Sequence, residues 1–312
     1  GVQVPVGPHM SSHSYITNPK NEDIFINING ECVHRSEAKI SVFDSGFLLG
    51  DGVWEGIRLH NNVLVFIENH LNRLFASAEG ISLDIPFTKN QIIEQIDKVL
   101  LKNNMKDDVH IRLIISRGDK ITPYQNPNAN VGPINLVIIP EHKKTTPDTY
   151  SNGISIGRVP NIRPNESILS PQFNTLSKLN CILASIEANK LGYDEGIMHD
   201  LNGNISTCNS TNLFFIKNNK VITSTGQYCL NGITRNKAIK ICLENDIICN
   251  EIDFDYNDIN DCEEAFVTGT FAGIIPVSNF EGRKLQSTAS NSIVNQIRHL
   301  YNQHINEYVE SK

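Results

Sequence analysis

The sequence has no apolar run long enough to cross a membrane and no excess of basic residues. A transmembrane helix needs about 18 to 20 consecutive apolar residues, and no stretch of the 312 residues approaches that length. Lys and Arg total 27 against 34 Asp and Glu, which gives a net charge of -7. These absences argue against a membrane protein and against a nucleic-acid-binding protein, which would need a basic surface.

The cysteines are odd in number and scattered along the chain. The seven include no C-x-x-C pair and no group of cysteine and histidine with zinc-ligand spacing. This pattern argues against a zinc site and against a disulfide framework. We therefore expect no metal, and free thiols in a reducing compartment, which would be the cytoplasm or the inside of an organelle.

The composition that remains is typical of a globular protein of two domains. Hydrophobic residues make up 39% and charged residues 20% of a chain long enough for two moderate domains. We interpret residues 1–9, which lack the features of a signal peptide, as a cloning remnant before a native start near Met10. Residues 144–153 are polar and contain Pro and Gly, so we predict a linker there. A smaller N-terminal domain would cover 10–143 and a larger C-terminal domain 154–312.

Apolar periodicity predicts strands and helices in both halves. The expected strands are 23–30, 62–67, 109–118, 134–140, 153–159, 195–200, 212–217, 220–224 and two within 263–277. The expected helices are 68–80, 88–104, 178–191, 232–246 and 288–308. Thr88 and Ser177 are the expected N-caps of the second and third helices. The mixture favours an α/β fold with α+β layers over a βαβ repeat.

Two short stretches have the residues of an anion site. "LNGITR" (230–235) places Gly232, Ile233 and Thr234 where a helix begins, and the first amides of a helix have no partner within it. "VTGTFAG" (267–273) is a Gly-Thr turn between apolar strands. Both stretches can hold a phosphate. Taken alone, each also fits an ordinary Thr-capped helix or an ordinary tight turn.

Arg73 lies near the apolar edge of the expected helix 68–80. A surface arginine is usually solvated, but a fixed guanidinium can bind a phosphate through two parallel hydrogen bonds. The local sequence leaves both readings open. His70, His110 and His199 show no metal-ligand spacing, and we interpret them as structural.

Four motifs in order resemble the class IV aminotransferases, the family of branched-chain and D-amino acid aminotransferases and aminodeoxychorismate lyases. They are "FDSGFLLGDGVWEGIRLHNNVLVFIENHLNRL" (43–74), "LASIEANKLGYDEGIMHDLNGNIS" with "NSTNLFFI" (183–216), "LNGITR" (230–235) and "EEAFVTGTFAGIIPV" (263–277). The resemblance covers about residues 25 to 305. It implies a two-domain fold with pyridoxal 5'-phosphate, or pyridoxamine phosphate, in a cleft between the domains. It also implies amino acid and 2-oxo acid substrates and usually a homodimer.

The resemblance also implies roles for individual residues. Arg73 is similar to the family's phosphate-binding arginine. The positions that match its phosphate-binding loops are Leu230, Gly232, Ile233, Thr234, Gly269 and Thr270. Arg112 resembles a substrate-side position of the branched-chain enzymes.

Two central positions depart from the family. The downstream stretches "IEANKLGYDEG" and "NLFF" align without gaps. This register puts Asn174 where the family has its Schiff-base lysine, and Thr207 where it has the glutamate beside the pyridine nitrogen. An asparagine amide is neither nucleophilic nor basic, so it cannot replace the lysine. A threonine brings no charge to keep the ring nitrogen protonated, so the ring would be a weaker electron sink.

Lys178, four residues after Asn174, is the candidate for the missing amine. In a helix over 178–191 the separation would be about one turn, or about 6 Å along the axis, which a lysine side chain can cover. Three functions stay open. The first is an aminotransferase that uses Lys178 or noncovalent pyridoxamine phosphate, and the second is a cofactor-binding pseudoenzyme. The third is a lyase similar to the aminodeoxychorismate branch, because the residue spacing in "TLSKLN" is close to that of this branch. We expect an aminotransferase acting on a small amino acid, with branched-chain ones included.

Overall fold

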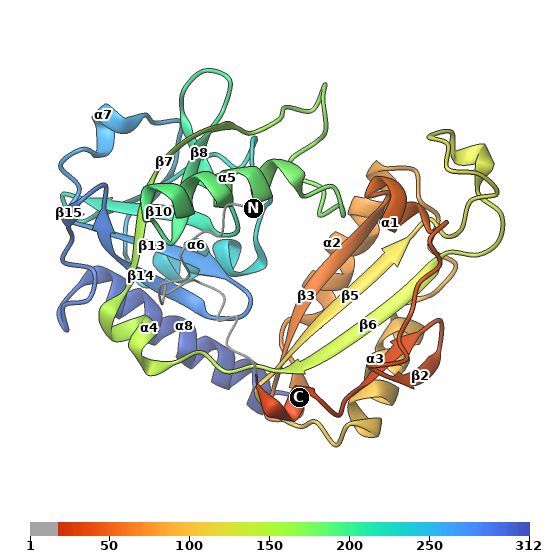
Figure 1. Ribbon diagram of the computed structural model, residues 1–312. Coiled ribbons are helices and arrows are strands. Elements are labelled where there is room, and N and C mark those ends of the chain that lie inside the picture. Colours follow the sequence, from red (N-terminus) through yellow and green to blue (C-terminus); the bar gives the residue numbers. More distant parts are fainter. Residues whose placement is uncertain (1–17) are drawn as a thin grey trace. The chain divides into compact units, whose positions relative to one another are not determined.

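The computed structural model describes residues 18–312, so the expected cloning remnant lies outside the described residues. The chain forms two compact units (Figure 1). The N-terminal unit contains residues 18–144, Phe173–Lys178 and Tyr308–Lys312, and the C-terminal unit contains Thr145–Gln172 and Leu179–Glu307. The stretch expected as a linker includes a short helix, α4 (Pro147–Asn152).

The N-terminal unit is built on an antiparallel sheet of six strands, counted over the described residues, in the order β2-β1-β6-β5-β3-β4. Its strands are β1 (Phe25–Ile28), β2 (Glu31–His34), β3 (Gly52–His60), β4 (Val63–Leu64), β5 (Val109–Ser116) and β6 (Asn135–His142). Its helical elements are η1 (Pro19–Asn21), α1 (Ser45–Leu49), α2 (Ile67–Gly80), α3 (Lys89–Lys102) and η2 (Pro127–Ala129). The sequence patterns did not predict β3, although it pairs with β5 along its whole length.

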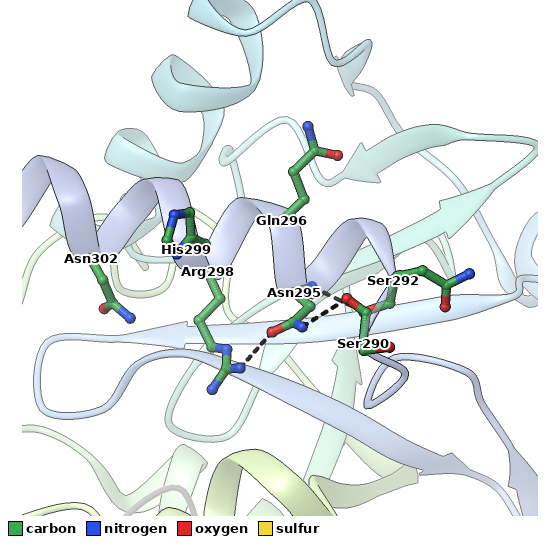
Figure 2. Close-up of a pocket in the computed structure, with 8 residues that line it drawn as sticks. Ser290, Ser292, Asn295, Gln296, Arg298, His299 and Asn302 are labelled. Atoms are coloured by element: carbon green, nitrogen blue, oxygen red, sulfur yellow. Dashed lines mark hydrogen bonds between the residues drawn. The ribbon is translucent and has the colours of Figure 1, made fainter.

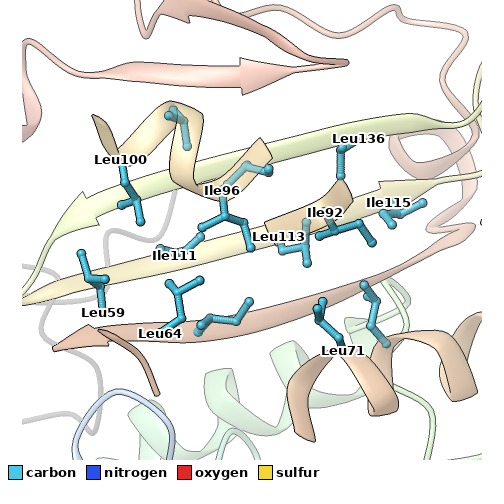
Figure 3. Packing of buried hydrophobic residues seen from close by; sticks show 14 of the residues in the cluster. Leu59, Leu64, Leu71, Ile92, Ile96, Leu100, Ile111, Leu113, Ile115 and Leu136 are labelled. Atoms are coloured by element: carbon cyan, nitrogen blue, oxygen red, sulfur yellow. The ribbon is translucent and has the colours of Figure 1, made fainter. Parts of the chain in front are cut away.

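The core of this unit lies between the sheet and the helices α2 and α3. Figure 3 shows Leu71 of α2 and Ile96 of α3 among the apolar side chains of the sheet. In β5, Ile111 and Leu113 are fully buried whereas Arg112 between them is exposed, because successive side chains of a strand point to opposite faces. Each buried Ile or Leu stabilises the fold by about 1.5–3 kcal/mol.

Helix α3 begins as the sequence predicts. Thr88 is its N-cap, and the Thr88 hydroxyl accepts a hydrogen bond from the Gln91 amide at 3.2 Å. The Gln91 side chain accepts one from the Thr88 amide at 2.8 Å. These reciprocal bonds satisfy two amides that the helix itself leaves unpaired.

The C-terminal unit contains, in the described part of the chain, a sheet of nine strands in the order β12-β11-β10-β13-β14-β7-β8-β9, with β15 beside β14. The strands are β7 (Ile154–Ile162), β8 (Glu195–His199), β9 (Ile205–Cys208), β10 (Asn212–Lys217), β11 (Lys220–Thr223), β12 (Cys249–Glu251), β13 (Glu264–Gly269), β14 (Gly273–Phe280) and β15 (Arg283–Lys284). The helices are α5 (Leu179–Leu191), α6 (Ile233–Glu244), α7 (Tyr256–Ile259) and α8 (Ile293–Glu310). Parallel and antiparallel pairs mix in this sheet, which confirms the α/β class.

Helix α5 corrects two expectations. It begins at Leu179, one residue later than predicted, and Ser177 is not its N-cap. Its expected apolar face is exposed, with Leu179 and Ile182 at 66% and 52%, whereas Ala184 and Ala188 are fully buried. The small alanines let the helix pack closely on β7 and β8.

Two findings concern the described residues as a whole. Within residues 18–312, none of the helices combines the length and apolarity that a membrane span requires. All seven cysteines fall in this range, and each is a free thiol.

Candidate functional site

Helix α6 of the C-terminal unit begins without a side-chain cap. Gly232 is the N-cap residue, with φ -62° and ψ 139°, and no side chain among residues 18–312 caps the helix start. The helix has 12 residues, so the amides of Ile233 and Thr234 stand at the positive end of a full helix dipole. This is the local geometry of an anion site.

Asn212, the first residue of β10, holds the start of α6 in place. Its Nδ2 donates to the Leu230 carbonyl at 2.9 Å. A Cβ added to Gly232 would lie 2.3 Å from the Asn212 Oδ1. Glycine is therefore required at 232 by this close approach, a contact that the sequence did not reveal.

The structure brings the second predicted phosphate stretch to the same place. Asn212 is the register partner of Thr268 at the end of β13. A Cβ added to Gly269 would lie 3.7 Å from the Cγ2 of Thr211, the residue that precedes Asn212. Thr270 follows and is half-buried. The two stretches 230–234 and 269–270, separate in sequence, thus meet around Thr211 and Asn212.

The donors at this place fit a phosphate. The Thr268 hydroxyl is buried and has no hydrogen-bond partner within the described range, and a buried hydroxyl is normally satisfied. Arg235 is 2% exposed, and its Nη2 is bound to the Ser224 carbonyl and to Glu251, both at 2.6 Å. The Arg235 charge is thus already paired with Glu251, and the amides at the start of α6 and the Thr268 hydroxyl are the donors proposed for the anion.

Thr207 lies on β9 and is buried. Its hydroxyl donates to the Thr211 carbonyl at 2.8 Å. The buried carboxylate of Glu195 accepts from the Thr211 hydroxyl at 2.7 Å and from the Ser210 hydroxyl at 2.8 Å. Both Thr207 and Glu195 therefore fix the loop that leads into β10. Glu195 was missed at sequence level, and its motif "YDEG" was its only signal.

In the N-terminal unit, Arg73 belongs to a buried ion-pair network and is not solvated. Its Nε and Nη2 donate to the two carboxylate oxygens of Glu55, each at 2.7 Å, and His70 Nδ1 lies 2.7 Å from Oε2. Burial opposes the ionisation of Glu55, but Arg73 and His70 outweigh it and hold the pKa of Glu55 below its ordinary value. The two parallel bonds expected for a phosphate are here made to Glu55, so a phosphate role for Arg73 stays a prediction.

Asn174 lies in the segment Phe173–Lys178, which runs beside the start of β3. The Trp54 amide donates to the Asn174 carbonyl at 3.0 Å. The Asn174 amide donates to the Ser77 hydroxyl at 3.0 Å, and its Nδ2 donates to the Trp54 carbonyl at 2.7 Å. The residue is 1% exposed. Asn174 is therefore an integral part of the fold of this unit.

The extended course of this segment overturns the helical geometry expected for Lys178. The Leu176 amide donates to the Gly52 carbonyl at 2.9 Å, and Thr175 forms an isolated antiparallel bridge with Val53. Residues 174–178 are therefore not helical, and the rise of roughly 6 Å per helical turn does not apply to them. The argument that Lys178 stands one turn from Asn174 is therefore wrong.

Lys178 instead lies close to the ring of Trp54. Its Nζ is 5.6 Å from the ring centre, and the Arg112 guanidinium stacks on the same ring at 4.0 Å. A cation over an aromatic face is attracted by the ring electrons. The structure thus brings Lys178 and the predicted substrate-side residue Arg112 to one side chain.

A polar pocket elsewhere in the C-terminal unit offers a contrast. It has a volume of about 670 Å³ and lies along the first turns of α8, where Arg298 donates to Asn295 (Figure 2). The first amides of α8 are already bonded by the Glu264 carboxylate at 3.1 and 2.9 Å. The start of α8 is therefore occupied by an acidic side chain, unlike the start of α6, and none of the predicted phosphate-site residues lines this pocket.

A mixed sheet with an uncapped helix start beside a Gly-Thr turn is an α/β architecture with a candidate phosphate site. The sequence model of the amino-transferase class IV family matches residues 52–280, and the chain belongs to this family. Class IV aminotransferases depend on pyridoxal phosphate, whose phosphate fits the donors described above.

The chain is similar to proteins named for branched-chain amino acids and to proteins named for D-alanine. It is 33% identical over 285 residues to branched-chain-amino-acid aminotransferase-like protein 2 of Arabidopsis thaliana, a match that covers 91% of this chain. The chain spans about half the length of that relative (50%) and of a second Arabidopsis relative (51%). It is 28% identical to the D-alanine aminotransferase of Staphylococcus haemolyticus, over 91% of this chain and 98% of that protein.

Solved structures confirm the fold class. The branched-chain aminotransferase of Thermoproteus uzoniensis, solved with norvaline, has a TM-score of 0.80 and 26% identity. The match covers 91% of this chain and 95% of that one. The predicted family and the mixed α/β class are thus both confirmed.

Proposed function

We propose that this chain is a pyridoxal phosphate-dependent aminotransferase that transfers an amino group between a small amino acid and a 2-oxo acid. The observation that carries the proposal is the uncapped start of α6, placed beside Gly269 through Thr211 and Asn212. When bound, pyridoxal phosphate would supply the carrier for the amino group between the two substrates. The names of the relatives make branched-chain amino acids and D-alanine the first substrates to test.

The phosphate would be held by the backbone amides of Ile233 and Thr234. The backbone amide and the hydroxyl of Thr270, the residue after Gly269, would complete the site. Leu230 contributes through its carbonyl, which keeps Asn212 in place. We retain Arg73 as a proposed cationic partner of the phosphate, with Glu55 orienting its guanidinium.

Lys178 would move the proton during transfer, because the amide of Asn174 cannot do so. Lys178 is half-buried and lies at the face of Trp54. Arg112, at the same ring, would receive a carboxylate of the substrate, since a guanidinium donates two parallel hydrogen bonds to a carboxylate. The Thr207 hydroxyl already donates its hydrogen bond to the Thr211 carbonyl. It would therefore contact the cofactor's ring nitrogen through its oxygen.

The experiment is a transfer assay with L-leucine or D-alanine as donor and 2-oxoglutarate as acceptor, with added pyridoxal phosphate. We expect a new amino acid to form. Lys178→Met should abolish transfer and leave cofactor binding intact. Lys190→Met, which removes an exposed lysine paired with Glu187 at 2.7 Å, should leave the rate unchanged.

Other results would refute the proposal. Cofactor binding without transfer from any amino acid would point to a cofactor-binding pseudoenzyme. Release of a 2-oxo acid without an amino acceptor would point to a lyase. Equal loss of activity in Lys178→Met and Lys190→Met would remove Lys178 from the reaction.

We also propose a homodimer, on the family resemblance, and a cytoplasmic location, on the free thiols. Sedimentation of the purified chain tests the first, and imaging of the tagged chain tests the second.

A further inference from the structure

The side chain of Asn174 uses only one of its two polar groups. Its Nδ2 donates to the Trp54 carbonyl at 2.7 Å. Its Oδ1 is buried and accepts no hydrogen bond in the part of the chain that the structure describes. The residue as a whole is 1% exposed. A buried acceptor without a donor is destabilising and is rare in folded proteins.

The orientation of this carboxamide is determined by its neighbour. Rotating the amide by 180° would place Oδ1 against the Trp54 carbonyl, so that two acceptors would face each other and the bond from Nδ2 would be lost. The backbone on both sides is also fixed, through Ser77 and Trp54. This orientation therefore leaves Oδ1 as a buried acceptor without a donor among the described residues.

We infer that the Asn174 Oδ1 is a binding point for an amino group, and that this chain binds pyridoxamine phosphate in preference to pyridoxal phosphate. The inference rests on the proposed function, because it takes residue 174 to stand where the family has its lysine. Pyridoxamine phosphate carries a primary amine where pyridoxal phosphate carries an aldehyde. The amine can donate an N–H to Oδ1, whereas the aldehyde oxygen would meet it as a second acceptor.

A lysine at this position would have the opposite preference. Its amine condenses with an aldehyde and would repel a second, protonated amine. The exchange of lysine for asparagine thus changes the site from one that captures the aldehyde form covalently to one that binds the amine form by hydrogen bonding. The chain would then hold its cofactor only through noncovalent contacts.

A competing explanation lies in the same place. Trp54 Nε1 is a buried donor without a partner among residues 18–312. A small rearrangement that paired it with the Asn174 Oδ1 would satisfy both atoms and leave no site for an amine. The two forms of the cofactor would then bind equally well at this position.

The test uses the full chain, freed of cofactor, in separate calorimetric titrations with pyridoxamine phosphate and pyridoxal phosphate. We expect pyridoxamine phosphate to bind at least about tenfold more tightly, the effect of one hydrogen bond. Asn174→Leu, which removes Oδ1 at similar volume, should abolish this preference. Asn174→Lys should reverse it and give a pyridoxal adduct that borohydride fixes to the protein.

Asn161→Leu is the matched control, because Asn161 also has a buried Oδ1 without a partner in the described range. It lies on β7 and should leave the preference unchanged. Equal affinities of the wild-type chain for the two forms, or tighter pyridoxal phosphate, would overturn the inference. A borohydride-fixed group on Lys178 would also overturn it, since the aldehyde would then be captured covalently.

The outcomes separate this inference from the proposed function. Failure of both forms to bind would refute the cofactor proposal itself. Binding of both forms with no preference for the amine would leave the cofactor proposal standing and remove only the role of Asn174. The wild-type titrations decide this even if Asn174→Leu does not fold.

Discussion

Replacing Glu55 by glutamine should destabilise the N-terminal unit strongly. The Glu55 carboxylate is fully buried and is bound at 2.7 Å by Arg73 through two bonds and by His70 through a third. Removal of one partner from a buried ion pair costs about 3–5 kcal/mol, because the remaining charge is left uncompensated. We expect Glu55→Gln to lower the free energy of unfolding by this amount.

The control is an ion pair of similar geometry at the surface. Glu281 pairs with Arg158 at 2.7 Å, but the Arg158 side chain is 54% exposed. Such pairs contribute about 0–1 kcal/mol, so Glu281→Gln should have little effect. Urea unfolding can be followed by the fluorescence of Trp54, the single tryptophan of the chain. It precedes Glu55 on β3 and therefore reports on the N-terminal unit.

The same carboxylate should make stability depend on pH. The pKa of Glu55 is held below its ordinary value of 4.5. A carboxylate with a depressed pKa contributes its full stabilisation above the unfolded-state pKa and loses it as the pH falls through the folded-state pKa. The wild-type unit should thus lose stability below about pH 4.5, and Glu55→Gln should lose less there. Equal effects of Glu55→Gln and Glu281→Gln at neutral pH would refute the reasoning.

Two glycine substitutions test the contacts that shape each unit. Gly232→Ala places a Cβ 2.3 Å from the Oδ1 of Asn212, so it should weaken the binding of pyridoxal phosphate several-fold in a calorimetric titration, and unchanged affinity would contradict the assignment of the phosphate site. Gly80→Ala places a Cβ 2.2 Å from the ring of Phe173, so it should lower the melting temperature of the chain as followed by Trp fluorescence, and an unchanged value would show that the segment can move aside.

Local sequence patterns predicted the elements whose signals are local. Strand β5 alternates apolar and polar residues, and α3 begins at a Thr followed three residues later by Gln. Strand β3 was missed because Gly52, Glu55 and Gly56 interrupt its apolar pattern. Glu55 points into the core only because Arg73, 18 residues later, neutralises it there.

The residues at the candidate site also depend on contacts between distant parts of the chain, which local sequence patterns do not predict. The resemblance to a family indicated the candidate phosphate stretches, but the contact through Asn212 that joins them depends on the pairing of β10 with β13. The helical spacing expected between Asn174 and Lys178 was wrong because residues 174–176 bond to a strand about 120 positions earlier in the chain. Helix periodicity after Lys178 contains no information about such a distant partner.

The two positions predicted to depart from the family have a structural feature in common. Asn174 and Thr207 each donate a side-chain hydrogen bond to a backbone carbonyl, at Trp54 and at Thr211 respectively. A glutamate at 207 is ionised at neutral pH and has no proton to donate, so Thr207→Glu would leave the Thr211 carbonyl with one donor, the Cys208 amide at 3.0 Å.

Placing at 207 the glutamate that the resemblance predicts for the family should therefore carry a cost in stability. We expect Thr207→Glu to lower the free energy of unfolding of the C-terminal unit by about 0.5–1.5 kcal/mol, the net contribution of one hydrogen bond, measured by the urea dependence of backbone circular dichroism. Thr207→Ser, which keeps the hydroxyl, is the control and should be near neutral. If Thr207→Glu were as stable as Thr207→Ser, the hydroxyl bond to Thr211 would not hold the loop. If it is destabilised as expected, the fold of this unit depends on the Thr207 hydroxyl at the position where the resemblance predicts a glutamate.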